Sequence, residues 1–243
     1  MYIALIAAPG SGKTTLAKET ERVLNEEYEI VSTATAPLFI PGRSLLYRLG
    51  WLVYGWLYFD RALFRLYFRF TGMRNWYRQR GIQNKLWRLY IPIVSSYYLQ
   101  QKQATEIAVV VDDESALGRY QVVAVKDSHA DTLDAKFVAA FSDTIIDTYG
   151  KVLVVEIDTP PAVAAKRRVV RDGLEIAEWD EYVSRKEQSH QRHKALVEKI
   201  GASFSDETVT VMTVDGTKAP EVLAKEVAEK VMEIGEFGVR GEG

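Results

Sequence analysis

The sequence predicts an α/β protein built on a doubly wound parallel sheet of five strands, with a helical insertion. Short apolar runs alternate along the chain with segments of helical periodicity, which is the pattern of strand–helix–strand units. The first apolar run leads into a glycine-rich loop and then into a helix. With 243 residues and 47% hydrophobic content, we predict a single domain over residues 1–243 whose insertion occupies about residues 43–105.

The first half of the chain starts with a predicted buried strand. Residues 2–8 are apolar and rich in strand formers, and they end at Pro9 and Gly10. Apolar side chains then recur at helical spacing over residues 16–24. The elements that follow are a strand at 29–34, a long helical region at 43–90 and a third strand at the apolar run 107–111.

The second half continues the alternation, and Pro160 and Pro161 mark the start of one of its helices. Ligands of such sheets bind at the carboxyl ends of the strands, so the residues that follow each strand are the functional candidates. The expected elements are a helix at 130–149, a strand at 151–158, a basic helix at 160–172, a longer helix at 178–200, a strand at 209–214 and a last helix at 220–234.

The loop after the first strand reads "AAPGSGKTT" and fits a phosphate-binding P-loop of Walker A type. Gly10 and Gly12 let successive N–H groups point at phosphate oxygens, and the helix that follows adds its positive end. Lys13 is expected to reach the outer phosphates as a catalytic residue, and the Thr14 hydroxyl to ligate Mg²⁺. Ala7 replaces the first glycine of the pattern, a mild departure at a strand end. The predicted nucleotide-binding residues of this loop are Pro9, Gly10, Ser11, Gly12, Lys13, Thr14 and Thr15.

Acidic residues follow the third strand in the sequence "VVVDDES". A carboxylate at such a strand end holds Mg²⁺ or accepts the proton of an attacking hydroxyl. Alternate side chains of a strand face the same way, so Asp112 is the first candidate for catalysis and metal binding, with Glu114 as a second metal ligand. The same strand ending is typical of ATPases in which a glutamate activates water. ATP hydrolysis therefore remains an alternative function.

The helix predicted at 160–172 carries four cationic side chains within six residues. Arg167 and Arg171 are one helical turn apart and share a face. Because phosphoryl transfer spreads negative charge over the equatorial oxygens, we expect these two arginines to be catalytic and to close on the transferring phosphate.

The sequence "VDGTKAPEV" follows the last strand, and here the chain resembles nucleoside-monophosphate kinases and their thymidylate-kinase-like relatives. The resemblance covers residues 1–34 and 107–234. It implies a P-loop NTPase fold, ATP and Mg²⁺ as cofactors, a small-molecule phosphoryl acceptor and often a homodimer. It also implies that Gly216, Thr217 and Lys218 line the loop around the adenine of ATP, with Gly216 and Thr217 binding it.

Two segments depart from that family, and both belong to its acceptor site. "STATAPLFIPG" replaces the usual Arg-Glu-Pro-Gly after the second strand, and Asp112-Asp113 replaces Asp-Arg after the third. Deoxynucleoside kinases resemble the chain no better at that strand, and no guanine motif of GTPases is present. We therefore expect a cytoplasmic ATP-dependent phosphotransferase whose acceptor is a nucleotide, a nucleoside or a related small molecule. The alternative is an ATPase that couples hydrolysis to a partner or to a process at a membrane surface.

Residues 43–90 combine ten basic side chains with one acid, a net charge of 10 − 1 = +9, and hold four of the five tryptophans. Three functional interpretations stay open beside that of a buried helical hairpin, which could also form a dimer interface. These are an acceptor pocket, a peripheral membrane contact and, least favoured, a nucleic-acid contact. The run 45–59 is too short to span a membrane.

Three further features of the sequence bear on metal binding and on localisation. His190 and His193 lie on a charged helix without a third ligand nearby, and we interpret them as solvated helix positions. The sequence contains no cysteine, which excludes disulfides and thiolate metal sites. The first residues do not resemble a signal peptide, in keeping with the cytoplasmic expectation.

Overall fold

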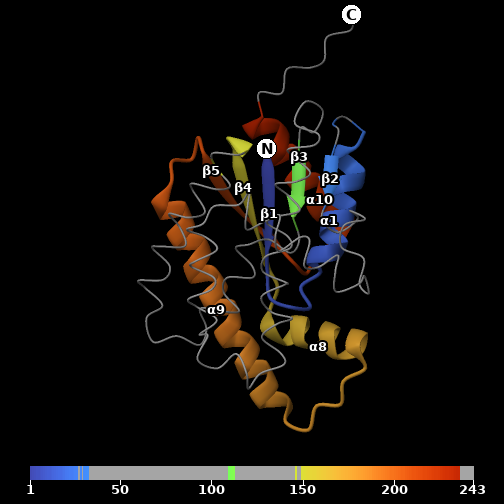
Figure 1. Cartoon of the computed structure of the whole chain (residues 1–243). Coiled ribbons are helices and arrows are strands. Elements are labelled where there is room, and N and C mark those ends of the chain that lie inside the picture. The colour runs from blue at the N-terminus through green and yellow to red at the C-terminus, as the bar shows by residue number, and fades with distance from the viewer. Residues whose placement is uncertain (27, 29, 33–108, 113–145, 147–148, 236–243) are drawn as a thin grey trace, which may run out of the picture.

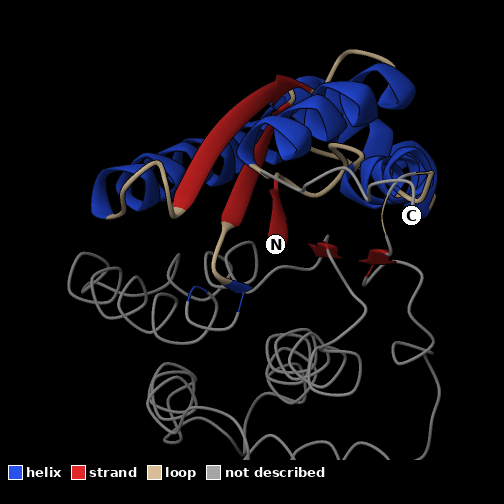
Figure 2. Ribbon diagram, turned by 90° about the horizontal axis from the view of Figure 1, so that it is seen from above, coloured by secondary structure: helices blue, strands red, loops and turns tan. Residues whose placement is uncertain are grey.

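The computed structural model describes residues 1–26, 28, 30–32, 109–112, 146 and 149–235. These residues form one sheet of five parallel strands in the order β2-β3-β1-β4-β5. Figure 2 shows the strands following one another across a twisted sheet, with the described helices packed against it. The strands are β1 (Tyr2–Ile6), β2 (Ile30–Ser32), β3 (Val109–Asp112), β4 (Val152–Asp158) and β5 (Val209–Asp215).

Four long helices belong to the described part of the chain. Two of them begin at a proline, whose missing N–H costs nothing in the first helical turn. One ends at Gly173, which adopts the left-handed conformation (φ 60°) that glycine takes without strain. The helices are α1 (Lys13–Leu24), α8 (Pro161–Asp172), α9 (Trp179–Ser203) and α10 (Pro220–Ile234).

One face of the sheet packs against α1 and α10. Alternate residues of a strand point to the same face, and Ile3, Val111 and Val155 belong to the set that faces these helices. They join Leu16 of α1 and Val227 of α10 in one buried apolar cluster. The strands β1 and β4 are buried on both faces, which explains why each reads as an almost continuous apolar run in the sequence.

The opposite face of the sheet carries polar side chains and is covered beside β4 and β5 by α9. Val211 of β5 is in register with Val154 of β4 on this face, and a Cβ added to Gly201 of α9 would lie 3.5 Å from the Val211 side chain. Glu156 and Asp158 of β4 alternate with the core positions and point to the same side. Helices on both faces of a parallel sheet confirm the predicted α/β class.

All five strands end at the same edge, where α8 lies beneath the loop that joins β1 to α1 (Figure 1). None of the described helices combines the length and the apolar character needed to cross a membrane. Several predictions fall outside the described residues: the insertion at about 43–105, the interpretations of segment 43–90, the metal ligand Glu114 and most of the helix at 130–149.

Candidate functional site

The loop between β1 and α1, which is predicted to bind phosphate, contains two glycines with positive φ angles. Gly10 (φ 102°) and Gly12 (φ 94°) both adopt the left-handed region that residues with a Cβ rarely take. Ser11 between them is buried, and both its N–H and its hydroxyl donate to the carbonyl oxygen of Ala8. Gly12 is the N-cap of α1, so no capping side chain covers the positive end of this helix.

Lys13 is the first residue of α1, and its side chain lies along the loop. Its Nζ donates to the carbonyl oxygen of Ala7 at 2.7 Å. Pro9, Thr14 and Thr15 are exposed around it. The predicted phosphate-binding residues therefore lie together at the carboxyl end of β1.

Helix α8 packs directly on this loop. A Cβ added to Gly10 would lie 2.1 Å from the carbonyl oxygen of Ala164 and 3.2 Å from the Cβ of Arg168. Since even flexible packing does not tolerate 2.1 Å against a backbone atom, only glycine fits at position 10. The close contact holds the basic helix against the predicted phosphate-binding loop.

The two arginines predicted to be catalytic take different positions on α8. Arg167 donates from Nη1 to the carbonyl oxygen of Gly216 at 2.9 Å. Arg171 is exposed and binds Asp172 at 2.7 Å, and Arg168 binds the same carboxylate at 3.3 Å. The hydrogen bond from Arg171 is the main reason why the pKa of Asp172 is lowered. Their action on a transferring phosphate stays a prediction.

The loop after β5 is fixed to the end of β4. The Gly216 N–H donates to the carbonyl oxygen of Asp158 at 2.8 Å, and a Cβ added to Gly216 would lie 1.9 Å from the Thr159 hydroxyl oxygen. Asp215 accepts hydrogen bonds from the Thr217 N–H at 2.9 Å and from the Thr217 hydroxyl at 2.7 Å, which stabilises the turn. Gly216 and Thr217 are thus held at the same edge of the sheet as the phosphate-binding loop.

Asp112 ends β3 and is buried at 1% exposure. Its Oδ2 accepts a hydrogen bond from the Tyr2 hydroxyl, and its backbone is in register with Ala4 of β1. The carboxylate therefore lies on the neighbouring strand, near the point where β1 leads into the loop. In the part of the chain that the structure describes, no three carboxylates and imidazoles gather to hold a metal. A metal at Thr14 and Asp112 would therefore need ligands from outside these residues.

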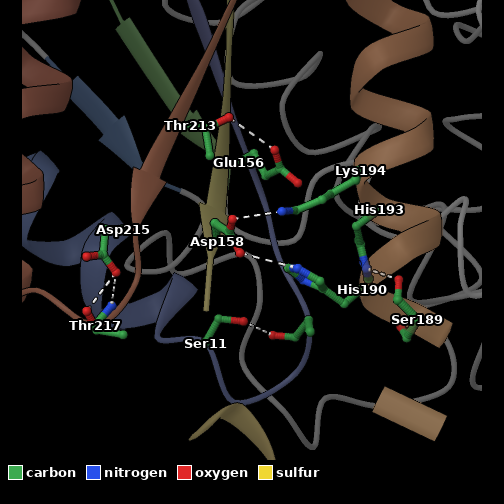
Figure 3. Close-up of polar contacts among 11 residues, drawn as sticks. Ser11, Glu156, Asp158, Ser189, His190, His193, Lys194, Thr213, Asp215 and Thr217 are labelled. Carbon is green, nitrogen blue, oxygen red and sulfur yellow. Dashed lines mark hydrogen bonds and ion pairs between the residues drawn. The ribbon is translucent and has the colours of Figure 1, made fainter. Parts of the chain in front are cut away.

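A polar cluster between β4 and α9 was not predicted from the sequence. Figure 3 shows side chains of α9 pointing at the end of β4. Asp158 accepts a hydrogen bond from Lys194 at 2.8 Å and lies 3.2 Å from Nε2 of His190. Glu156, at 6% exposure, accepts from the Thr213 hydroxyl at 3.1 Å, and its second carboxylate oxygen is buried without a hydrogen bond. These contacts attach α9 to the strand end.

The interpretation of His190 and His193 as solvated positions is wrong. The His190 side chain is 15% exposed beside Asp158, and His193 is 5% exposed. Nδ1 of His193 lies 2.6 Å from the Ser189 carbonyl oxygen, so this nitrogen carries the proton, because a carbonyl oxygen only accepts. Burial, followed by the charge of Lys13, lowers the pKa of His193 to about 4. The charged sequence around these residues concealed that one side of α9 faces the sheet.

Comparison with known proteins identifies the fold. No family model matches the sequence, and no curated protein matches it. Two solved structures of deoxyadenosine kinase from M. mycoides, one with bound dCTP and one with bound dATP, are similar to this chain. Each has a TM-score of 0.50 and 14% sequence identity, over 96% of this chain and 100% of that chain. The similarity supports a P-loop kinase fold, and the thymidylate-kinase-like subgroup is not confirmed.

Proposed function

We propose that this chain is an ATP-dependent phosphotransferase of the nucleoside-kinase type, which transfers the γ-phosphate of ATP in line to a nucleoside or nucleotide. The observation that carries the proposal is the contact between Gly10 and α8, which holds an arginine-bearing helix against a phosphate-binding loop. Phosphoryl transfer needs positioning and positive charge around the transferred group more than any other chemistry. The shared fold with a deoxyadenosine kinase supports a nucleoside as acceptor.

The donor side of the site fits a bound nucleotide. The left-handed Gly10 and Gly12 and the uncapped start of α1 form the cradle that phosphate oxygens require. Lys13 exchanges its bond with the Ala7 carbonyl for the outer phosphates, and Gly216 and Thr217 hold the base. Arg167 and Arg171 balance the charge of the transferred group.

The residues at the loop also fit a magnesium ion that arrives with the nucleotide. Thr14 offers a hydroxyl and Asp112 a carboxylate, with Glu114 as a further ligand, and oxygen atoms are what Mg²⁺ prefers. When bound, the ion neutralises charge on the phosphates. The proposed second role of Asp112, which is buried at the end of β3, is to accept the proton of the acceptor hydroxyl.

An acceptor screen tests the proposal. The purified protein is given Mg·ATP with deoxynucleosides, nucleosides, nucleoside monophosphates or sugars, and ADP release is measured together with the mass of the product. We expect one acceptor class to raise ADP release above the acceptor-free rate and to gain one phosphate. K13A should abolish this activity, while K18A, an exposed lysine on the same helix, should retain it.

A different result in the acceptor screen would support the alternative function, an ATPase. If ADP release is rapid without an acceptor and no compound in the screen raises it or gains a phosphate, the phosphotransferase proposal is wrong. Loss of the acceptor-free rate in E114Q would then assign hydrolysis to this chain.

A further inference from the structure

Tyr2 is a buried tyrosine whose hydroxyl group is bonded to the carboxylate at the end of β3. The residue is 1% exposed, and its hydroxyl donates to Oδ2 of Asp112, which is also 1% exposed. A phenylalanine would fill the same space with its ring, and burial of a hydroxyl costs free energy unless the hydroxyl is hydrogen-bonded. The contact with Asp112 therefore explains the hydroxyl of Tyr2, which packing alone does not.

The register of the sheet brings these two side chains to the same face. Tyr2 of β1 is in register with Val110 of β3, and Ala4 is in register with Asp112. Because alternate residues of a strand share a face, Tyr2 and Asp112 point away from α1 and α10, toward which Ile3 points. Asp112 is thus the diagonal neighbour of Tyr2, at a separation that an aromatic side chain can span.

Contacts of its backbone and of its ring hold Tyr2 in place. Its N–H donates to the carbonyl oxygen of Lys151 at 2.9 Å, and its ring lies against that of Tyr149, with 5.0 Å between the ring centroids. Tyr2 also pairs with strands on both sides, since β1 lies between β3 and β4. Asp112 is the last residue of its strand, so the tyrosine is the more firmly held member of the pair.

We propose that Tyr2 is a positioning residue of the phosphoryl-transfer site: its hydroxyl fixes Oδ2 of Asp112 and so sets the direction in which this carboxylate meets the acceptor hydroxyl or the magnesium ion. This role rests on the proposed function of Asp112, whereas the hydrogen bond itself is a feature of the structure. Orientation matters at this point because a misplacement of about 1 Å at a reacting group costs on the order of 100-fold in rate. Tyr2 acts through Asp112 and not on the reacting groups themselves.

A kinetic double-mutant cycle tests whether Tyr2 acts through Asp112. The constants kcat and KM for ATP are measured for the wild type, Y2F, D112A and Y2F/D112A, with the acceptor found in the screen or, if none is found, as acceptor-free ATP hydrolysis. We expect Y2F to lower kcat roughly 10-fold, since one hydrogen bond to a charged group is lost, and to leave the KM for ATP unchanged. In the D112A background the same change should lower kcat by less than about twofold.

Y182F supplies the matched control. The hydroxyl of Tyr182 on α9 is also buried, and it has no hydrogen-bond partner among the residues that the structure describes, so Y182F should equal the wild type in kcat. Equal relative losses of kcat from Y2F in the two backgrounds would assign Tyr2 to the fold alone and overturn the proposal. An unchanged kcat in Y2F would overturn it as well.

Urea denaturation of the same four proteins tests the hydrogen bond without any turnover. Y2F should lower the urea midpoint of the otherwise wild-type chain and should not lower that of D112A, in which the hydroxyl has lost its acceptor. D112N, which removes the charge and keeps the shape, takes the place of D112A if D112A does not fold. Equal shifts in both backgrounds would overturn the proposal even if an acceptor is found. Coupled shifts without turnover of any kind would instead refute the proposed function, and the positioning role with it.

Discussion

His193 shows how a single residue couples the phosphate-binding loop to stability. The ring is buried, donates a hydrogen bond to the Ser189 carbonyl oxygen and is affected by the positive charge of Lys13. A buried imidazole in such surroundings stays neutral at pH 7, because its pKa is lowered from 6.5 to about 4. In the unfolded chain the same ring takes up a proton at a much higher pH.

This difference predicts a loss of stability in acid. Between pH 6.5 and pH 4 the unfolded state binds more protons at His193 than the folded state, so the free energy of unfolding falls as the pH falls. At pH 5 the loss from this residue is about 2 kcal/mol relative to pH 7. Urea unfolding of the wild type and H193Q at both pH values measures it. H193Q should lose correspondingly less stability on acidification, and an equal loss in both proteins would contradict the assignment.

Gly10 and Gly12 form a matched pair for a second prediction. Both have positive φ angles, but a Cβ at Gly10 would meet the Ala164 carbonyl oxygen at 2.1 Å, whereas a Cβ at Gly12 meets nothing within 4 Å. G10A and G12A therefore share the cost of backbone strain, and only G10A also displaces α8. We expect G10A to be less stable than G12A by about 1–3 kcal/mol. Equal urea midpoints would show that α8 does not rest on the loop.

At the scale of elements, α8 joins the phosphate-binding loop at one point and the loop after β5 at another. Gly10 contacts Ala164 near the start of the helix, and Arg167 binds the Gly216 carbonyl one turn later. Arg171 lies further along and is engaged with Asp172 at the surface. Helix α8 thus contacts both of the loops that are proposed to hold the two ends of ATP.

Comparison of R167M with R171M tests this arrangement. If both arginines act on the transferring phosphate, both variants should lower kcat. Only R167M also loses the bond that holds Gly216, so only R167M should raise the KM for ATP, by roughly tenfold for one lost charge-assisted hydrogen bond. Steady-state kinetics with the acceptor found in the screen supply both constants. An equal KM for ATP in the two variants would show that the hydrogen bond from Arg167 to Gly216 does not contribute to ATP binding.

The elements differ in how far the sequence could predict them. The strands were readable because a buried parallel strand needs an apolar run on both faces, as "YIALI" and "VLVV" show. The buried face of α9 could not be predicted from the sequence, because its only apolar residues are Leu196, Val197 and Ile200 among the buried positions of this helix. Continuing that stripe backwards at helical spacing leads to His193 and Lys186, and polar residues on a buried face look like a solvated surface until the sheet is in place.

The features of the candidate site also differ in how far the sequence could predict them. The predicted phosphate-binding loop is a local pattern, so Gly10, Gly12 and Lys13 could be proposed from consecutive residues. The bond from Arg167 to Gly216 and the cluster around Asp158 join residues tens of positions apart. Such contacts depend on strand order and helix packing, which a single sequence does not specify.

For the whole molecule, the described contacts converge on one edge of the sheet. The loop after β1 is held by α8, the loop after β5 by Arg167, and α9 by the pairing of Asp158 with Lys194 and His190. Each of these contacts connects an element at the carboxyl ends of the strands to its neighbour. A ligand that binds this edge therefore contacts elements from both the first and the second half of the chain.

A nucleotide should consequently stabilise the whole fold rather than one loop. Binding to the folded state alone at a ligand concentration 100 times Kd adds about 2.7 kcal/mol, which for a chain of this size raises Tm by roughly 5–10 °C. Differential scanning fluorimetry with Mg·ATP should show this shift for the wild type and for K18A. K13A should show little shift, because it lacks the ammonium group that is proposed to bind the outer phosphates and that donates to the Ala7 carbonyl oxygen in this structure. A full shift in K13A would remove the phosphate-binding role from Lys13, and with it the basis for placing a nucleotide at this loop.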